Sequence, residues 1–531
     1  MLFPSVRTSR NCLNFILSKN TSAPHDSVYV IDLVVDHSKT DSDMLKKISP
    51  AISAVAFPKE VFPIAKQYWQ HSGDGVQSRR AEFCHELYLE GILVEKKILQ
   101  PAVSGFIKAC KGPRRYQRAS IDKTPRTSKV ENFSETDHAV PINGSEESKE
   151  SSQFLEERFG RNLDVSFVTN AKSAIRRRIS GSLLGEIDLS KPQLGPSTQS
   201  NMRGVAGLSE EDVYLYPCGM NSIFHAHQMM LKARGPMKSI SYGFPYVDTL
   251  KILEKFGPGV IFYGNGNSAD LDDLEARLKA GEKYLALFCE FPGNPMLTAP
   301  YLQRIRQLAD TYDFGVIVDE TIGNFINVHV LPHADVVVSS LTKIFSGECN
   351  VMGGATILNP KSRYYSSMKK VLDAEYEDNY WAEDAIFMER NSRHFVSRIE
   401  RINHNAEVIC SILLSHPLVK DLYYPKYNTS RIHYDACRTP NGGYGGLLSF
   451  TFKEEKQAIA FFDRIETAKG PSLGTNFTLT SPYVILAHFM ELDWAAKFGV
   501  PKDLIRISVG LEDEGELRET LRVALEAAEG V

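Results

Sequence analysis

Short apolar, β-branched runs alternate with helical patterns from about residue 154 onward. Seven runs are predicted strands: 213–216, 239–242, 260–263, 284–290, 315–319, 336–339 and 355–358. Helical patterns lie between several of them, as at 221–232, 271–280 and 301–312. Strands separated by helices indicate βαβ units around a mostly parallel sheet. Because ligands bind at the carboxyl ends of strands in such sheets, the residues that follow each strand are the candidates for chemistry.

The two ends of the chain follow other patterns. Residues 28–35 are typical of a strand, while 62–69 and 81–97 carry apolar residues at helical spacing. A long helical stretch at 378–414 precedes three predicted strands of a smaller α+β domain: 446–452, 476–479 and 505–509. Residues 111–152 are polar and hold almost no large apolar side chains, which predicts a disordered linker. The predicted organisation is an N-terminal extension (1–110), this linker (111–152), a large domain (153–400) and a C-terminal domain (401–531).

Composition and charge narrow the class of protein. The 531 residues include 61 Lys+Arg and 65 Asp+Glu, and a formal charge of −4 argues against a nucleic-acid binder. No apolar run approaches the ~18–20 residues that span a bilayer, so we expect no membrane protein. Eight scattered cysteines without a CxxC pair exclude a disulfide scaffold and a zinc ribbon, which favours a reducing, cytoplasmic compartment.

The first 25 residues leave a second location open. They contain Arg7, Arg10 and Lys19, and no acid precedes Asp26. This composition fits a mitochondrial presequence, although an ordinary frayed terminus explains it as well.

The ends of several predicted strands carry residues that suit one cofactor. Cys218-Gly219-Met220 lies between a strand and a helix, where backbone N–H groups favour an anion, although a tight turn explains a lone glycine equally well. Asp319 closes another strand and is also explained by a helix N-cap. Lys343 follows a buried strand beside two hydroxyl residues, and a desolvated lysine readily forms a Schiff base. Together these parts fit pyridoxal phosphate: a lysine for the aldehyde, an acid for the pyridinium nitrogen and a cradle for the phosphate.

Residues 339–354, SSLTKIFSGECNVMGG, resemble the lysine signature of the Cys/Met-metabolism family of pyridoxal-phosphate enzymes. Further similar blocks follow in the family's order: 216–220, 242–246, 290–295, 318–321, 472–474 and 506–513. Residues 62–80, FPIAKQYWQHSGDGVQSRR, are similar to the extension of its fungal cystathionine γ-synthase branch. The resemblance implies an α/β protein of the aspartate-aminotransferase-like fold type I, with a mostly parallel central sheet, a smaller C-terminal α+β domain and an N-terminal extension.

The resemblance also implies which residues bind the cofactor. Lys343 would hold it covalently and shuttle protons, Asp319 would pair with the pyridinium nitrogen, and Tyr242 would stack on the ring. Asn294 would approach the phenolic oxygen. The implied phosphate ligands are Gly219, Met220, Ser340 and Thr342.

Substrate binding and assembly are implied in the same way. Arg506 would grip the substrate α-carboxylate, where a planar guanidinium suits a carboxylate. Ser472 would line the same pocket. Arg161, in Phe159-Gly160-Arg161, stands where the family's arginine reaches the phosphate of a neighbouring subunit. The implied assembly is a homo-oligomer, a dimer or tetramer, with shared active sites. We expect no metal site.

The implied reaction is γ-replacement on an O-acyl-L-homoserine, with L-cysteine as nucleophile and L-cystathionine as product. Phe159 and Glu348 depart from the family pattern, which keeps a γ-synthase with another nucleophile, sulfide or a carbon acid, as an alternative. The fungal-type block at 62–80 argues against a lyase. Intact Lys343, Asp319 and Arg506 argue against an inactive, structural homologue.

Overall fold

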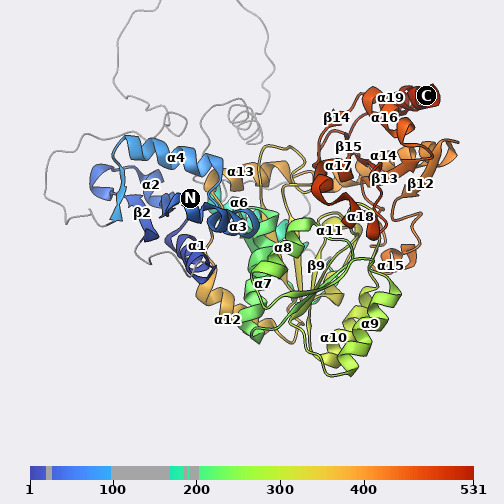
Figure 1. Ribbon diagram of the computed structural model, residues 1–531. Coiled ribbons are helices and arrows are strands. Elements are labelled where there is room, and N and C mark those ends of the chain that lie inside the picture. The colour runs from blue at the N-terminus through green and yellow to red at the C-terminus, as the bar shows by residue number, and fades with distance from the viewer. Residues whose placement is uncertain (20–26, 97–166, 184–188, 190–202) are drawn as a thin grey trace, which may run out of the picture.

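The computed structural model describes residues 1–19, 27–96, 167–183, 189 and 203–531. These residues form three β-sheets that follow one another along the chain (Figure 1). The predicted linker 111–152 lies outside the described residues, and the predicted boundary at residue 400 falls inside helix α14 (Phe395–Ser415). The limits of the domains therefore stay predictions.

An antiparallel sheet with strand order β1-β3-β2-β4 organises the N-terminal region. Its elements are β1 (Leu2–Phe3), α1 (Val6–Lys19), β2 (Tyr29–Val35), α2 (Asp43–Ile48), β3 (Ala51–Ala56), α3 (Phe62–Ser72), α4 (Ser78–Leu89) and β4 (Leu93–Glu95). The prediction of a helix over 81–97 is wrong at its end. Gly91 adopts φ +71°, which ends the helix, and the chain then returns to pair with β2.

The central sheet has the order β5-β11-β10-β9-β8-β6-β7. Its strands are β5 (Val213–Tyr216), β6 (Ser239–Tyr242), β7 (Val260–Tyr263), β8 (Ala286–Glu290), β9 (Gly315–Asp319), β10 (Val336–Ser340) and β11 (Gly354–Leu358). Only β11 runs antiparallel to the other six strands, so the prediction of a mostly parallel sheet is confirmed. The apolar run Val336–Val338 is fully buried because helices cover both faces of such a sheet.

The helices of this central region include the crossovers between its strands. They are α6 (Val168–Ser180), α7 (Gly219–Arg234), α8 (Val247–Lys255), α9 (Ser268–Lys279), α10 (Leu302–Tyr312), α11 (Asn324–Asn327), α12 (Tyr365–Glu375), α13 (Ala382–Asn391) and α14. The N-terminal region packs against this part of the chain. Phe3, Ile16 and Tyr68 belong to the same buried cluster as Phe224 and Met229 of α7. The N-terminal region and the central sheet therefore share a core.

A five-stranded sheet with helices forms the C-terminal α+β region, as predicted. Its elements are β12 (Val419–Tyr423), α15 (Arg431–Asp435), β13 (Leu447–Phe452), α16 (Glu455–Arg464), β14 (Ala468–Lys469), β15 (Leu479–Pro482), α17 (Tyr483–His488), α18 (Leu492–Lys497), β16 (Ile505–Ser508) and α19 (Glu514–Glu529). The strand expected at 476–479 instead begins at Leu479. The preceding residues bond elsewhere: Asn476 N–H donates to Gly347 O, and Thr478 N–H to the Glu512 carboxylate. Within the described residues, no helix is both long and apolar enough to cross a membrane.

Candidate active site

A cavity of about 310 Å³ opens where five strands of the central sheet end. It is lined by Cys218, Gly219, Met220, Ile223, Tyr246, Glu290, Pro292, Asn294, Asp319, Thr321, Ile322, Ser340, Thr342, Lys343, Met352 and Leu473. These residues come from segments up to about half the chain apart, and the parallel sheet brings their strand ends to one edge. The structure thus places Gly219, Met220, Asn294, Asp319, Ser340, Thr342 and Lys343 at one cavity.

Lys343 lies three residues beyond β10. Its Nζ donates a hydrogen bond of 2.9 Å to Ser472 Oγ, which belongs to the C-terminal region. Burial and the nearby charge of Arg506 lower the pKa of Lys343 below its usual range. A larger fraction of this amine is therefore neutral than on a solvated lysine. A covalent link to a cofactor and proton transfer both require the neutral amine.

Two carboxyl groups face each other at the ends of β8 and β9. Glu290 and Asp319 are paired in the sheet register, and desolvation raises the pKa of both. Asp319 accepts a hydrogen bond of 2.9 Å from Thr321 N–H, and within the described part of the chain it has no ion-pair partner. A protonated ring nitrogen would supply the missing positive charge, so this pair fits a pyridinium.

The first turn of α7 offers backbone N–H groups at the cavity. A Cβ on Gly219 would lie 2.6 Å from Ser340 Cβ, so only glycine allows this approach. Cys218 precedes the helix without capping it through its side chain, and burial raises the pKa of its thiol to about 11. Uncapped N–H groups beside the Ser340 and Thr342 hydroxyls suit a phosphate. The residues present therefore fit pyridoxal phosphate.

Arg506 on β16 lies beside this cavity within a hydrogen-bond network. Its Nη1 donates to Asn294 Oδ1 at 2.9 Å, and its Nη2 donates to the carbonyls of Pro471 and Ser472 at 2.6 and 2.8 Å. Burial lowers the pKa of Arg506 to about 10. Its guanidinium therefore has a fixed direction, as recognition of a carboxylate requires.

Tyr483 holds both Arg506 and Asn294 and was not among the residues predicted from the sequence. The guanidinium carbon of Arg506 lies 4.0 Å from the centre of the Tyr483 ring, and Asn294 Nδ2 donates to its hydroxyl at 2.7 Å. The sequence Ser481-Pro482-Tyr483 gives no signal of this role. The contact follows from the pairing of β15 with β16, which sets the start of α17 beside Arg506.

The structure corrects the prediction for Tyr242. This side chain is buried in the core on β6, and its hydroxyl donates to Asn267 O at 2.9 Å; it does not line the cavity. Gly243, with φ +87°, turns the chain after β6, and Tyr246 reaches the cavity instead. Tyr246 is thus the aromatic residue positioned to stack on a cofactor ring.

Two further predictions concern an active site shared between subunits and the absence of a metal site. Arg161 and Phe159 lie outside the described residues, so the shared active site stays a prediction. Within the described residues, no three or more His, Cys, Asp or Glu side chains form a group that could hold a metal ion.

Comparisons with known proteins agree with the class that this geometry defines, an enzyme built around pyridoxal phosphate. Residues 197–526 match the model of the Cys/Met metabolism PLP-dependent enzymes, and residues 1–77 match that of the N-terminal domain of fungal trans-sulfuration enzymes. The chain belongs to the Cys/Met-metabolism family and is a pyridoxal-phosphate-dependent transferase of the γ-replacement type.

Two relatives extend over the whole chain. A cystathionine gamma-synthase of Neurospora crassa is 57% identical over 100% of this chain and 86% of its own. A cystathionine gamma-synthase of Saccharomyces cerevisiae is 34% identical over 100% of this chain and 88% of its own. Among solved structures, a cystathionine gamma synthase from Xanthomonas oryzae pv. oryzae matches with a TM-score of 0.54 and 21% identity, covering 68% of this chain and 98% of that one. This structural match supports the fold.

Proposed function

We propose that this enzyme replaces the acyl group of an O-acyl-L-homoserine with L-cysteine and releases L-cystathionine. One observation carries the proposal: Ser472 contacts both Lys343, through its hydroxyl, and Arg506, through its carbonyl. An α-amino acid bound here would place its carboxylate on Arg506 and its amino-bearing carbon near Lys343. The relatives from Neurospora and Saccharomyces are named cystathionine gamma-synthases, which supports cystathionine as the product and therefore cysteine as the nucleophile.

Each residue of the site has a task in this reaction. Pyridoxal phosphate, when bound, supplies an electron sink that makes the hydrogens of the substrate carbons acidic. Lys343 Nζ takes and returns those protons, since its lowered pKa leaves more of it neutral. Arg506 fixes the substrate carboxylate, and Tyr483 and Asn294 hold Arg506 in place. The bond between the γ-carbon and the ester oxygen then breaks, so that the acyloxy group leaves as a carboxylate. The cysteine thiol loses its proton, and its sulfur bonds to the γ-carbon.

Product analysis tests the proposal. Purified holoenzyme receives O-acetyl-, O-succinyl- or O-phospho-L-homoserine with L-cysteine, and mass spectrometry follows the products. We expect cystathionine from wild type with at least one ester and none from Lys343→Ala. Ester consumption without cystathionine would refute cysteine as nucleophile, and sulfide and carbon acids are then supplied in its place.

Assembly and location form part of the proposal. A homo-oligomer with shared sites is supported by the family resemblance at Phe159-Gly160-Arg161. Light scattering gives its mass, and mixed oligomers of Arg161→Ala and Lys343→Ala subunits regain activity only if sites are shared. We also propose a cytoplasmic location, supported by the seven free cysteines of the described residues. Imaging of the tagged full chain distinguishes it from mitochondria.

A further inference from the structure

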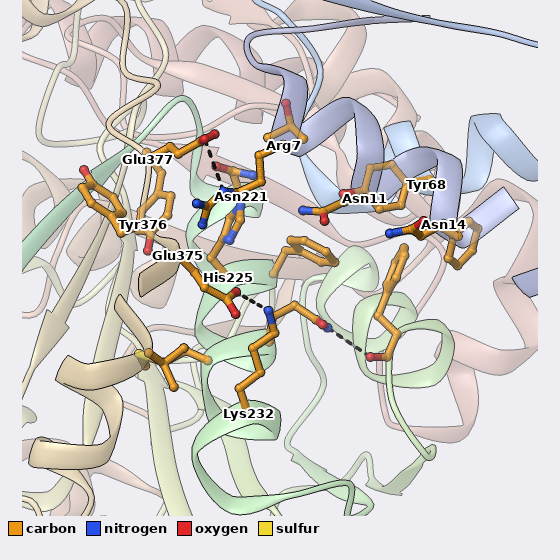
Figure 2. Close-up of a pocket in the computed structure, with 18 of the residues that line it drawn as sticks. Arg7, Asn11, Asn14, Tyr68, Asn221, His225, Lys232, Glu375, Tyr376 and Glu377 are labelled. Carbon is orange, nitrogen blue, oxygen red and sulfur yellow. Dashed lines mark hydrogen bonds and ion pairs between the residues drawn. The ribbon is translucent and has the colours of Figure 1, made fainter. Parts of the chain in front are cut away.

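A second cavity, of about 390 Å³, lies between the N-terminal region and helix α7 (Figure 2). It shares α7 with the active site but uses the opposite side of that helix. Gly219, Met220 and Ile223 face the catalytic cavity, whereas Asn221, Phe224, His225, Gln228 and Lys232 face the second one. The other walls come from α1, Tyr68 of α3, the end of α8 and the end of α12. The catalytic reaction makes no use of this space.

Aromatic rings form two walls of the cavity. Phe15 and Phe224 each lie against Phe256, with ring centres 5.0 and 5.1 Å apart, and Tyr68 joins them at 5.9 Å. On the other side His225 is stacked on Tyr216 at 5.3 Å. Tyr68, Phe224 and Tyr216 are almost fully buried. Phe15, Phe256 and His225 keep part of their surface exposed, which favours a ligand with a planar ring that can stack on them.

Amide side chains line the space between these walls. Asn11 and Asn14 reach it from α1 (Figure 2), and Gln228 of α7 also lines it. Asn14 is exposed to the cavity and has no hydrogen-bond partner among the described residues. Gln228 uses only its Nε2, which donates to Phe256 O at 3.0 Å. An amide offers a donor and an acceptor side by side, the pattern that pairs with the edge of a purine.

The charges at the cavity favour an anion. Its two acids are already paired, Glu375 with Lys232 and Glu377 with Arg7. Lys19 is left with only the Phe15 ring, at 5.9 Å, and within the described chain it has no carboxylate partner. Lys255 bonds to the His71 ring at 2.8 Å, and desolvation lowers its pKa. Lys19 therefore remains for a negatively charged group among the described residues, whereas Lys255 is already bonded to His71 and lies near the charges of Glu254 and Asp248.

We propose that this cavity binds a purine nucleotide, with its base between the aromatic walls and its phosphate toward Lys19. The ligand would touch α1 and α7 at once and thus join the N-terminal region to the helix whose first turn faces the catalytic cavity. Binding only to the folded protein stabilises it in proportion to ligand concentration. The proposal does not depend on the identity of the catalytic substrate.

Calorimetric titration of the holoenzyme tests the proposal. Bound pyridoxal phosphate occupies the catalytic phosphate cradle, so added nucleotide does not compete there. The probes are ATP, AMP, adenosine and inorganic phosphate. We expect one site per chain for AMP and ATP, weaker binding of adenosine and none of phosphate alone. Binding of phosphate as tight as that of AMP overturns recognition of the base, and adenosine binding as tightly as AMP overturns the role of Lys19. No binding of any purine at millimolar concentration overturns the proposal.

Two variants locate the site. Asn14→Trp fills the cavity from an exposed helix position and should weaken AMP at least about tenfold. Arg10→Trp is the matched control, since Arg10 is exposed on the same helix and does not line the cavity. Lys19→Gln should weaken AMP but leave adenosine unchanged. Equal AMP affinity in wild type and Asn14→Trp, with pyridoxal phosphate content intact in both, places the nucleotide elsewhere and refutes the assignment.

Discussion

The two cavities on either side of α7 are built in opposite ways. At the catalytic cavity, burial shifts the pKa values of several groups: it lowers that of Lys343 and raises those of Glu290 and Asp319. At the second cavity the acids are exposed or half-buried and carry partners of opposite charge. Unpaired, desolvated groups cost stability and are characteristic of catalytic sites. Paired, solvated groups cost little and can serve recognition.

The two cavities are nevertheless linked through one buried carboxylate. Asp74 of the N-terminal region accepts hydrogen bonds from Tyr68 and from Asn221 in the first turn of α7, and His225 Nε2 lies 2.9 Å from it. Gly73, next to Asp74, packs against the same turn. The N-terminal region thus supports the helix start that faces the catalytic cavity.

Replacing Lys343 should produce the largest difference between the two cavities. We expect Lys343→Ala to lower kcat/KM for the proposed reaction by about a thousandfold or more, since no other amine occupies this position among the lining residues. Nucleotide affinity at the second cavity should stay unchanged. Steady-state kinetics and calorimetry on the same preparation measure both. A parallel loss of nucleotide binding would show that the cavities are not independent.

A pair of glycines tests the support that the N-terminal region gives to α7. Gly73 and Gly91 have similar φ angles, +68° and +71°. A Cβ on Gly73 would lie 2.8 Å from Asn221 N, whereas one on Gly91 would meet nothing within 4 Å. We expect Gly91→Ala to cost about 1 kcal/mol of unfolding free energy from the backbone alone. Gly73→Ala should cost about 3 kcal/mol because it adds overlap with α7.

Urea unfolding of the two holoenzyme variants provides the measurement, with pyridoxal phosphate affinity as a second readout. Only Gly73→Ala should weaken the cofactor, because its new methyl group displaces the first turn of α7. Equal losses in both variants would mean that the contact with α7 contributes nothing.

Two histidines of α7 repeat the contrast between a group with a charged partner and a group without one. His225 bonds to Asp74, whereas His227 is fully buried, with its Nε2 3.3 Å from Ser239 Oγ and its Nδ1 without a partner in the described structure. Burial lowers the pKa of His227 to about 3. A lowered histidine pKa gives stability that is present above the unfolded value near 6.5 and is lost as pH falls toward 3. Between pH 7 and pH 5 this one group should remove about 2 kcal/mol of unfolding free energy.

Unfolding of His227→Gln at both pH values checks this expectation. The glutamine variant should lose about 2 kcal/mol less than wild type over the same interval. His404→Gln, at an exposed position, is the control for loss of any histidine. If wild type and His227→Gln show the same pH dependence, His227 is not buried in its neutral form.

The sequence predicted much more of the catalytic cavity than of the second cavity, for a physical reason. Asp319 ends a strand, Gly219 and Lys343 follow strands, and the parallel sheet alone brings strand ends together. The cavity on the other side of α7 depends on where α1 packs, and no local pattern specifies that. Tyr483 was missed for the same reason, since only the pairing of β15 with β16 sets it beside Arg506. The prediction that a strand starts at residue 476 was wrong. The backbone N–H groups of Asn476 and Thr478 bond to Gly347 O and to the Glu512 carboxylate, and not to a neighbouring strand.

The smallest expected effect concerns the tyrosine that the sequence misplaced. Tyr246→Ala should weaken pyridoxal phosphate by about tenfold, the size of one lost stacking contact. Tyr246→Phe keeps the ring and should bind the cofactor as wild type does. Tyr242→Phe removes the hydrogen bond to Asn267 O, which costs about 1 kcal/mol of stability and leaves cofactor affinity unchanged. Spectroscopic titration of the apoenzymes with pyridoxal phosphate distinguishes the two positions. If Tyr246→Ala binds pyridoxal phosphate as tightly as wild type, Tyr246 does not stack on the cofactor ring and the arrangement of this loop is contradicted.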